Sequence, residues 1–215
     1  MKNYSNNVTI AGEVRTTPET YNCCGENFYS FSVAVKRDSG VEDIIPVNVS
    51  QVLIKNVKVG DKVCLVGQIR TYNKSQDGKS RLVIVLFVQS IKEYINDLNE
   101  VELTGYFCKN PVYRTTPLGR DICDIILAVN RERRKSDYVP CIVWGRTAAL
   151  ISNLNVGVKV NVQGRFQSRV YEKKTDDGNK KFTAYEVSIN RIQKALEEVV
   201  VWSLQNAINA GRQCL

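Results

Sequence analysis

The sequence contains no histidine, and only one methionine and two tryptophans, among its 215 residues. Histidine is the side chain that ordinarily changes charge near neutral pH, so its absence argues against most acid–base and triad chemistry. The sequence also lacks a phosphate-cradling Gly-Lys loop and a carboxylate cluster typical of a two-metal site. No apolar run approaches the roughly 20 residues that span a bilayer. These absences make an enzyme the least supported class and argue against a membrane-spanning protein.

Metal-binding patterns are missing as well. The chain has an odd number of cysteines, namely Cys23, Cys24, Cys64, Cys108, Cys123, Cys141 and Cys214. No two of them form a CxxC pair, so the spacing of a structural zinc site is absent. The segment MKNYSNNVTI (residues 1–10) lacks the apolar stretch of a signal peptide. We therefore expect reduced thiols, no metal, no cofactor and a cytoplasmic location.

The charge is unevenly distributed along the chain. The net charge is +8, with 12 basic and 9 acidic side chains in residues 1–95 and 17 basic and 10 acidic in residues 99–194. A basic excess suits a polyanionic partner, although solubility alone can also account for a modest excess. The second half is thus the better candidate for binding nucleic acid.

The sequence repeats itself, which is a feature to establish before any motif. FSVAVKRDSGVEDIIPVNVS (31–50) matches DIILAVNRERRKSDYVPCIVW (124–144) at an offset of 94, which aligns Pro46 with Pro140. Later segments match at an offset of 97, and the three-residue slip falls between Ser50 and Gly60. We infer a duplicated domain, with copies at residues 1–95 and 99–194 and an extension at residues 195–215.

Each copy has the pattern of a small β-barrel. Short runs rich in β-formers are separated by turn signals, and the segment RTAALISNL (146–154) reads as one short helix. Five strands with a helix between the third and fourth is the order of an oligonucleotide/oligosaccharide-binding (OB) barrel, whereas a β-sandwich usually needs more strands. The fold class we predict is therefore all-β, with two tandem five-stranded OB barrels that each carry this helix.

Alternation along two strands of the second copy predicts an exposed face. In SDYVPCIVW (136–144), Val139, Cys141 and Val143 should fill the core, which leaves Tyr138 and Trp144 on the opposite side. The next strand should present its odd positions there, namely Arg165, Gln167, Arg169 and Tyr171. Bases stack on aromatic rings whatever their identity, so this face favours single-stranded nucleic acid, because a duplex hides its base faces. Each ring taken singly could instead pack in an interface.

Two basic hairpins flank this face. The first carries Arg131, Arg133, Arg134 and Lys135, and the second carries Lys173 and Lys174 together with Lys180 and Lys181. Cations here would neutralise phosphates, so binding should weaken as salt rises. A basic hairpin considered alone is more often only a solvated loop.

At these residues the second copy resembles the bacterial single-stranded DNA-binding protein family. PVYRTTPLGRDICDIILAVNRERRKSDYVPCIVWGRTA (111–148) and NVGVKVNVQGRFQSRVYEKKTDDG (155–178) are similar to two of its segments. The resemblance implies an OB fold and base-stacking roles for Tyr138, Trp144 and Tyr171. A further tryptophan of the family would fall near Arg133, where this chain has none.

The first copy is a divergent member of the pair. It has Ile44 where Tyr138 stands, Ser50 where Trp144 stands and Lys74 where Tyr171 stands. Because these three residues offer no aromatic platform, we expect the first copy to bind nucleic acid less tightly and to serve partly as scaffold.

The segment LEEVVVWSLQNAINAGRQCL (196–215) differs from the family's Gly/Pro/Gln-rich tail with an acidic tip. Its apolar spacing fits a helix, although its start could equally be a strand. It could dock on a barrel or another subunit, or bind a partner.

The resemblance implies a non-enzymatic, largely sequence-independent binder of single-stranded DNA. Such a protein would protect exposed strands in DNA replication, recombination or repair, and would be associated with the nucleoid. By analogy with a family assembly of four barrels, we expect a homodimer. RNA is a further possible ligand. The alternative is an OB-fold protein-interaction subunit of a replication-restart, conjugation or phage complex.

Overall fold

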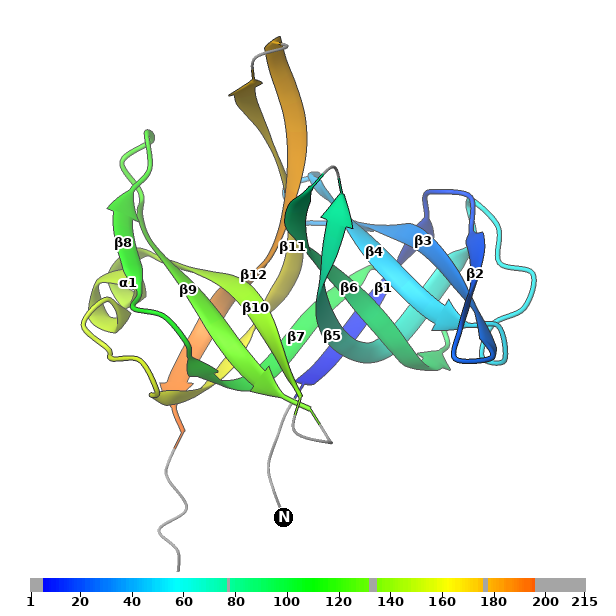
Figure 1. Cartoon of the computed structure of the whole chain (residues 1–215), viewed down its shortest axis with the longest axis horizontal. Helices are drawn as coiled ribbons and strands as arrows, with labels where there is room; N and C mark the ends of the chain where they lie inside the picture. The colour runs from blue at the N-terminus through cyan, green and yellow to red at the C-terminus, as the bar shows by residue number, and fades with distance from the viewer. Residues whose placement is uncertain (1–5, 77, 132–134, 176–177, 196–215) are drawn as a thin grey trace, which may run out of the picture.

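The computed structural model describes residues 6–76, 78–131, 135–175 and 178–195 (Figure 1). The first half of the chain forms β1 (Asn6–Val14), β2 (Glu19–Cys23), β3 (Glu26–Lys36), β4 (Glu42–Ser50), β5 (Lys62–Gln76) and β6 (Lys79–Lys92). The second half forms β7 (Leu98–Phe107), β8 (Val112–Thr115), β9 (Asp121–Asn130), β10 (Ser136–Trp144), α1 (Gly145–Ile151), β11 (Lys159–Thr175) and β12 (Gly178–Lys194). The domain boundaries proposed at residues 95 and 99 fall close to the connection between β6 and β7.

Both halves close into five-stranded barrels of the predicted OB topology. The strands of the first barrel follow the order β1-β5-β6-β4-β3, and the β3–β1 pairing closes it. The second barrel follows the order β7-β11-β12-β10-β9 and is closed by the β7–β9 pairing. The short strands β2 and β8, which the sequence did not predict, add to the outer edges of β3 and β9.

The predicted helix is present in the second barrel only. In the first barrel, residues 51–53 form a turn directly after β4, so the expectation of a helix there was wrong. The first copy has three fewer residues between the third and fourth strands of its barrel, which leaves no room for two helical turns and a return. The C-terminal extension beyond Ala195 lies outside the described residues.

The core positions follow the predicted alternation. Val139, Cys141 and Val143 are at most 3% exposed, whereas Tyr138 on the other face is 51% exposed. Glycines at equivalent places let two strands approach closely. A Cβ atom would lie 2.0 Å from the Phe87 carbonyl oxygen at Gly67 and 2.2 Å from the Ser188 carbonyl oxygen at Gly164. Each glycine adjoins a register shift, so these are β-bulges that bend β5 and β11.

The two barrels share one continuous sheet through their first strands. β1 pairs antiparallel with β7, and Val8 lies opposite Val101. The flanking contacts repeat on both sides of this pairing: the side chain of Asn6 exchanges two hydrogen bonds with the backbone of Ile69, and Asn99 does the same with Phe166. The duplicated halves are thus related by a pseudo-two-fold axis within one chain.

Two buried aspartates fasten the barrels together farther from this axis. Asp137 of β10 accepts hydrogen bonds from Arg131, from Arg70 and from the Thr71 N–H of β5. At the position related by the pseudo-two-fold axis, Asp43 of β4 accepts hydrogen bonds from Arg37 and from the Ser168 N–H of β11. We call these groups the Asp137 clasp and the Asp43 clasp. Each aspartate lies near the start of the third strand of its own barrel, and it is hydrogen-bonded to the backbone of the fourth strand of the other barrel, which is β5 for Asp137 and β11 for Asp43.

Candidate nucleic-acid interface

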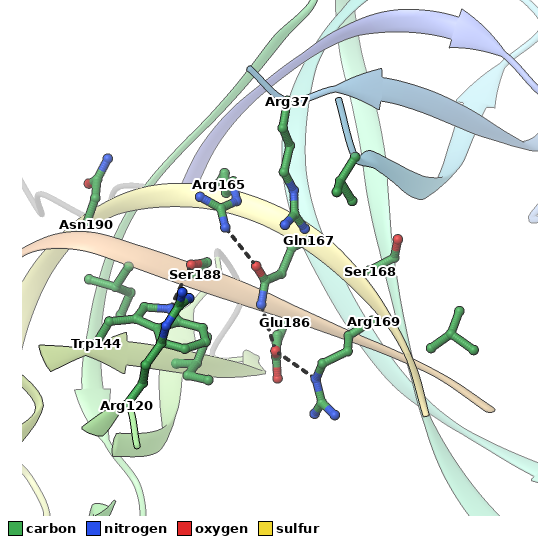
Figure 2. A pocket seen from close by; sticks show the side chains of 14 residues that line it. Arg37, Arg120, Trp144, Arg165, Gln167, Ser168, Arg169, Glu186, Ser188 and Asn190 are labelled. Atoms are coloured by element: carbon green, nitrogen blue, oxygen red, sulfur yellow. Dashed lines mark hydrogen bonds and ion pairs between the residues drawn. The ribbon is translucent and has the colours of Figure 1, made fainter. Parts of the chain in front are cut away.

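A cleft of about 720 Å³ runs over the outer face of β11 and β12 (Figure 2). Most of its wall comes from the second barrel, with Trp144 at the end of β10 and Arg120 just before β9. The first barrel contributes Arg37 and Val41, from the connection between β3 and β4. The remaining lining residues are Ile142, Arg165, Gln167, Ser168, Arg169, Val170, Glu186, Ser188, Ile189 and Asn190. Four arginines therefore face a cleft whose wall contains one carboxylate.

Hydrogen bonds connect the polar residues on the floor of the cleft. Arg165 Nη2 donates to Gln167 Oε1 (3.2 Å), and Gln167 Nε2 donates to Glu186 Oε1 (2.7 Å). Arg169 Nε lies 3.6 Å from the same Glu186 oxygen, and its side chain is 51% exposed. Gln167 is only 4% exposed, which differs from its prediction as a surface contact. Its amide links Arg165 to Glu186, and the carboxylate of Glu186 lies beside Arg169.

Trp144 forms one side of the cleft with its indole partly open to solvent. The ring is 37% exposed, and its Nε1 donates to Ser188 Oγ (3.1 Å). The side chain also borders a second depression, which is formed with Arg120, Gly145 and Leu150. A flat ring that is fixed by a hydrogen bond and still accessible is suited to stacking on a planar group.

A second aromatic platform lies farther along β11. Tyr171 stacks on Phe182 of β12, with ring centroids 5.8 Å apart and planes inclined by 28°. Arg169 lies over the Tyr171 ring, and Arg81 of the first barrel lies over Phe182. The stack holds Tyr171, which is 40% exposed, on the hairpin that projects above the barrels in Figure 1.

The three predicted rings do not share one cleft. Trp144 lines it, while Tyr171 lies beyond its edge and Tyr138 lies at the contact with the first barrel. The Tyr138 N–H donates to Thr71 Oγ1 (2.9 Å), and the ring itself is half exposed. Tyr138 and Trp144 do share the outer face of β10, as the alternation predicted.

The basic residues fall into three groups. Arg131 differs from its prediction, because its guanidinium is held by Asp137 and by the Thr71 carbonyl oxygen (3.1 Å) in the Asp137 clasp. Lys135 is exposed beside it. Arg133 and Arg134 lie outside the described residues, and so do the side chains of Lys173 and Lys174, whose backbone belongs to β11.

Sequence reasoning missed several residues of the interface. Arg37 could have been found, because the offset of 94 pairs it with Arg131 in the other basic hairpin. Phe182, Ser188 and Glu186 all lie on β12, whose outward positions were not considered. Arg120 precedes β9 in a turn whose direction depends on the tertiary structure.

The described residues provide neither a membrane span nor a metal centre. No helix among them has the length and apolar character needed to cross a bilayer. Their cysteine and acidic side chains form no group of three or more that could hold a metal ion.

Comparison with known proteins shows a similarity confined mainly to the second barrel. The model described as "Single-strand binding protein family" matches residues 98–195. Single-stranded DNA-binding protein 1 of Staphylococcus aureus (strain COL) is 43% identical over 82 residues, which are 35% of this chain and 49% of that protein. Single-stranded DNA-binding protein 2 of Listeria monocytogenes is 35% identical over 103 residues, which are 45% of this chain and 62% of that protein. The chain thus spans about half to three fifths of these relatives.

Solved structures match both barrels together. The wild-type single-stranded DNA binding protein from Thermus aquaticus superposes with a TM-score of 0.70 at 20% identity, covering 90% of this chain and 94% of that one. A deletion mutant of the same protein gives a TM-score of 0.69 at 21% identity, covering 92% and 98%. At this identity the likeness establishes the tandem fold. The family match and the sequence relatives together show that residues 98–195 are similar to the single-strand binding protein family.

Proposed function

We propose that this protein binds single-stranded DNA with little regard to sequence and protects exposed strands during replication, recombination or repair. One observation carries the proposal: the partly exposed Trp144 indole borders the same cleft as Arg165 and Arg169. A base can stack on the indole while its phosphates meet the guanidinium groups. A duplex offers phosphates but no free base faces, so it would use only half of this surface.

The second barrel carries most of the binding. Its stacking candidates are Trp144, the supported Tyr171 and Tyr138, and its cations are Arg165, Arg169 and Lys135, joined by Arg133, Arg134, Lys173 and Lys174 of the hairpins. Arg131 we assign to holding the barrels together. The first barrel, with Ile44, Ser50 and Lys74 at the three ring positions, binds less tightly and acts partly as scaffold.

The role is binding rather than catalysis, in the cytoplasm and on the nucleoid. Two chains would bring four barrels together, so the proposed assembly is a homodimer, which light scattering distinguishes from a 24.3 kDa monomer. RNA is a secondary ligand, because stacking does not read the 2′-hydroxyl.

A second candidate function is protein contact within a replication-restart, conjugation or phage complex. It is favoured by Leu118 and Leu150, which are 84% and 73% exposed, and by the position of Leu150 on the depression beside Trp144. An exposed apolar side chain beside a depression suits a protein partner better than a polyanion.

The two functions differ in what removal of the rings does. With a labelled oligothymidine and fluorescence anisotropy, Trp144→Ala and Tyr171→Ala should each weaken binding by about 1–3 kcal/mol, because each removes one stacking surface. Tyr113→Ala is the matched control, since Tyr113 is 43% exposed on β8 and does not line the cleft. Unchanged affinity in both ring variants would support the protein-contact function instead.

Direct titration completes the test. In a Trp202→Phe background, Trp144 is the only tryptophan, and its fluorescence should be quenched by single-stranded DNA far more than by duplex. Affinity should fall as salt rises, because bound phosphates release counterions.

A further inference from the structure

Arg37 and Arg165 come from different barrels and face the same cleft. Arg37 follows β3 of the first barrel, and Figure 2 shows its side chain reaching toward Arg165 and Gln167 on β11. Arg165 is half-buried at the bend of β11, next to Gly164. Like charges brought together in a partly desolvated place repel one another unless an anion lies between them.

Among the described residues, the hydrogen bonds of these two arginines leave one buried nitrogen without a partner. Arg37 donates through Nε and Nη2 to both oxygens of Asp43, so its carboxylate partner is already engaged. Arg165 donates through Nη2 to Gln167, but its buried Nε has no partner among the described residues. An unsatisfied buried donor costs about 1–3 kcal/mol, and more when the group is charged. A structure retains such a group most readily where a ligand completes it.

The pseudo-two-fold axis provides an internal comparison. In the Asp137 clasp, a second arginine, Arg70, bonds directly to the aspartate (3.3 Å) beside Arg131. Both arginines there are matched to one carboxylate, and no buried donor of theirs lacks a partner. At the position equivalent to Arg165, the first barrel has the neutral Gln68. Two arginines thus accompany one aspartate on each side, but among the described residues only the side that carries Trp144 has a buried guanidinium nitrogen without a partner.

The electrostatics of Arg165 agree with an anion site. Burial lowers the pKa of its guanidinium, and repulsion by Arg37 lowers it further, while Asp43 offsets this only in part. The negative charge of an anion bound between the two arginines would favour the charged guanidinium and so oppose both effects.

We infer that Arg165 and Arg37 together form a seat for one backbone phosphate, so that the first barrel contributes directly to the binding cleft of the second. This inference rests on the proposed function and adds to it a cross-barrel contact. The ligand class is a phosphodiester, because the guanidinium fork matches two phosphate oxygens and the cleft continues to the Trp144 ring.

The test is the salt dependence of oligothymidine binding by the full chain, measured by anisotropy between about 50 and 200 mM salt. Each phosphate contact to a single strand adds about 0.7 to the slope of log affinity against log salt. Arg165→Gln, which introduces the side chain of Gln68, should reduce the slope by about 0.7. The affinity loss over this fourfold salt range then shrinks by about 2.6-fold. Arg165→Lys keeps the charge and should keep the slope.

Two further variants make the result specific. Arg37→Gln combined with Asp43→Asn removes the first barrel's cation without leaving a buried charge, and should also reduce the slope by about 0.7. Arg191→Gln, which alters an exposed arginine of β12 outside the cleft, should leave the slope unchanged.

The outcomes separate the inference from the function on which it rests. If Arg165→Gln binds oligothymidine tightly and its salt slope equals that of the wild type, the phosphate seat is refuted. The proposed function then still stands. A slope reduced by Arg165→Gln and unchanged by the Arg37/Asp43 pair overturns the cross-barrel contribution. Failure of the wild type to bind oligothymidine overturns both.

Discussion

Replacing Asp137 by alanine should separate the structural role of the Asp137 clasp from that of an ordinary surface ion pair. The carboxylate of Asp137 is fully buried, with 0% side-chain exposure, and it is the common acceptor for Arg131, Arg70 and the Thr71 N–H. The variant would leave two guanidinium groups and one amide hydrogen without their acceptor at the junction between the barrels.

The magnitude follows from this arrangement. Removing one partner of a buried ion pair costs about 3–5 kcal/mol, because the remaining charge stays desolvated. The two arginines are about one quarter exposed, so water can reach them in part, and we expect the lower end of this range, about 3 kcal/mol. Asp137→Asn keeps one acceptor oxygen and should cost less.

Chemical denaturation followed by circular dichroism measures this difference in the free energy of unfolding. The matched control is Asp124→Ala, because Arg114 and Asp124 also form a two-hydrogen-bond pair but are 46% and 37% exposed. An exposed pair contributes at most about 1 kcal/mol. If Asp137→Ala and Asp124→Ala lower the free energy of unfolding equally, the Asp137 clasp does not stabilise the contact between the barrels more than an exposed ion pair would.

Three other outcomes are expected. Phe182→Ala should weaken oligothymidine binding by up to about 1.5 kcal/mol in the anisotropy assay, because it removes the ring that supports Tyr171; no change would mean that the stack is dispensable. Gly164→Ala should lower the free energy of unfolding by about 1–3 kcal/mol in denaturant melts, since its Cβ would lie 2.2 Å from the Ser188 carbonyl oxygen, whereas the neighbouring Gln163→Ala should have little effect. Burial raises the pKa of the Cys141 thiol above the ordinary 9.0, so the unfolded chain ionises first and stability should decline as pH rises past that value. Thermal melts of Cys141→Val should decline less over the same pH range, and parallel curves would contradict this explanation.

Most of the fold could be predicted because it depends on local alternation and on the internal repeat. Val139, Cys141 and Val143 are buried as expected, and Tyr138 lies on the opposite face. The change of offset between Ser50 and Gly60 located a place where the copies differ in length. The connection in the first copy is shorter and contains no helix. The change of offset already implied this, but the prediction of one helix in each copy did not take the shorter connection into account.

The candidate site was less predictable because burial there depends on the second barrel's neighbours. Gln167 was expected on the exposed face of β11, yet it is buried and hydrogen-bonded to Arg165 and Glu186. The Ser168 hydroxyl accepts a hydrogen bond from the Ile44 N–H across the barrel contact. Arg131 was predicted to bind nucleic acid from a basic hairpin, whereas the β1–β7 pairing brings it against Thr71. The last two contacts join residues of different copies, so no sequence pattern within one copy could have predicted them.

Joining two barrels through β1 and β7 in one polypeptide also changes what evolution can do with their contact. In an assembly of identical chains, any substitution appears on both sides of the symmetry axis at once. Here a substitution appears on one side alone, so Arg165 and Gln68 could diverge from a common ancestor while the paired strands stayed matched. Because the two barrels belong to one polypeptide, they also remain together at any dilution. One barrel can therefore specialise in binding the ligand while the other maintains the fold.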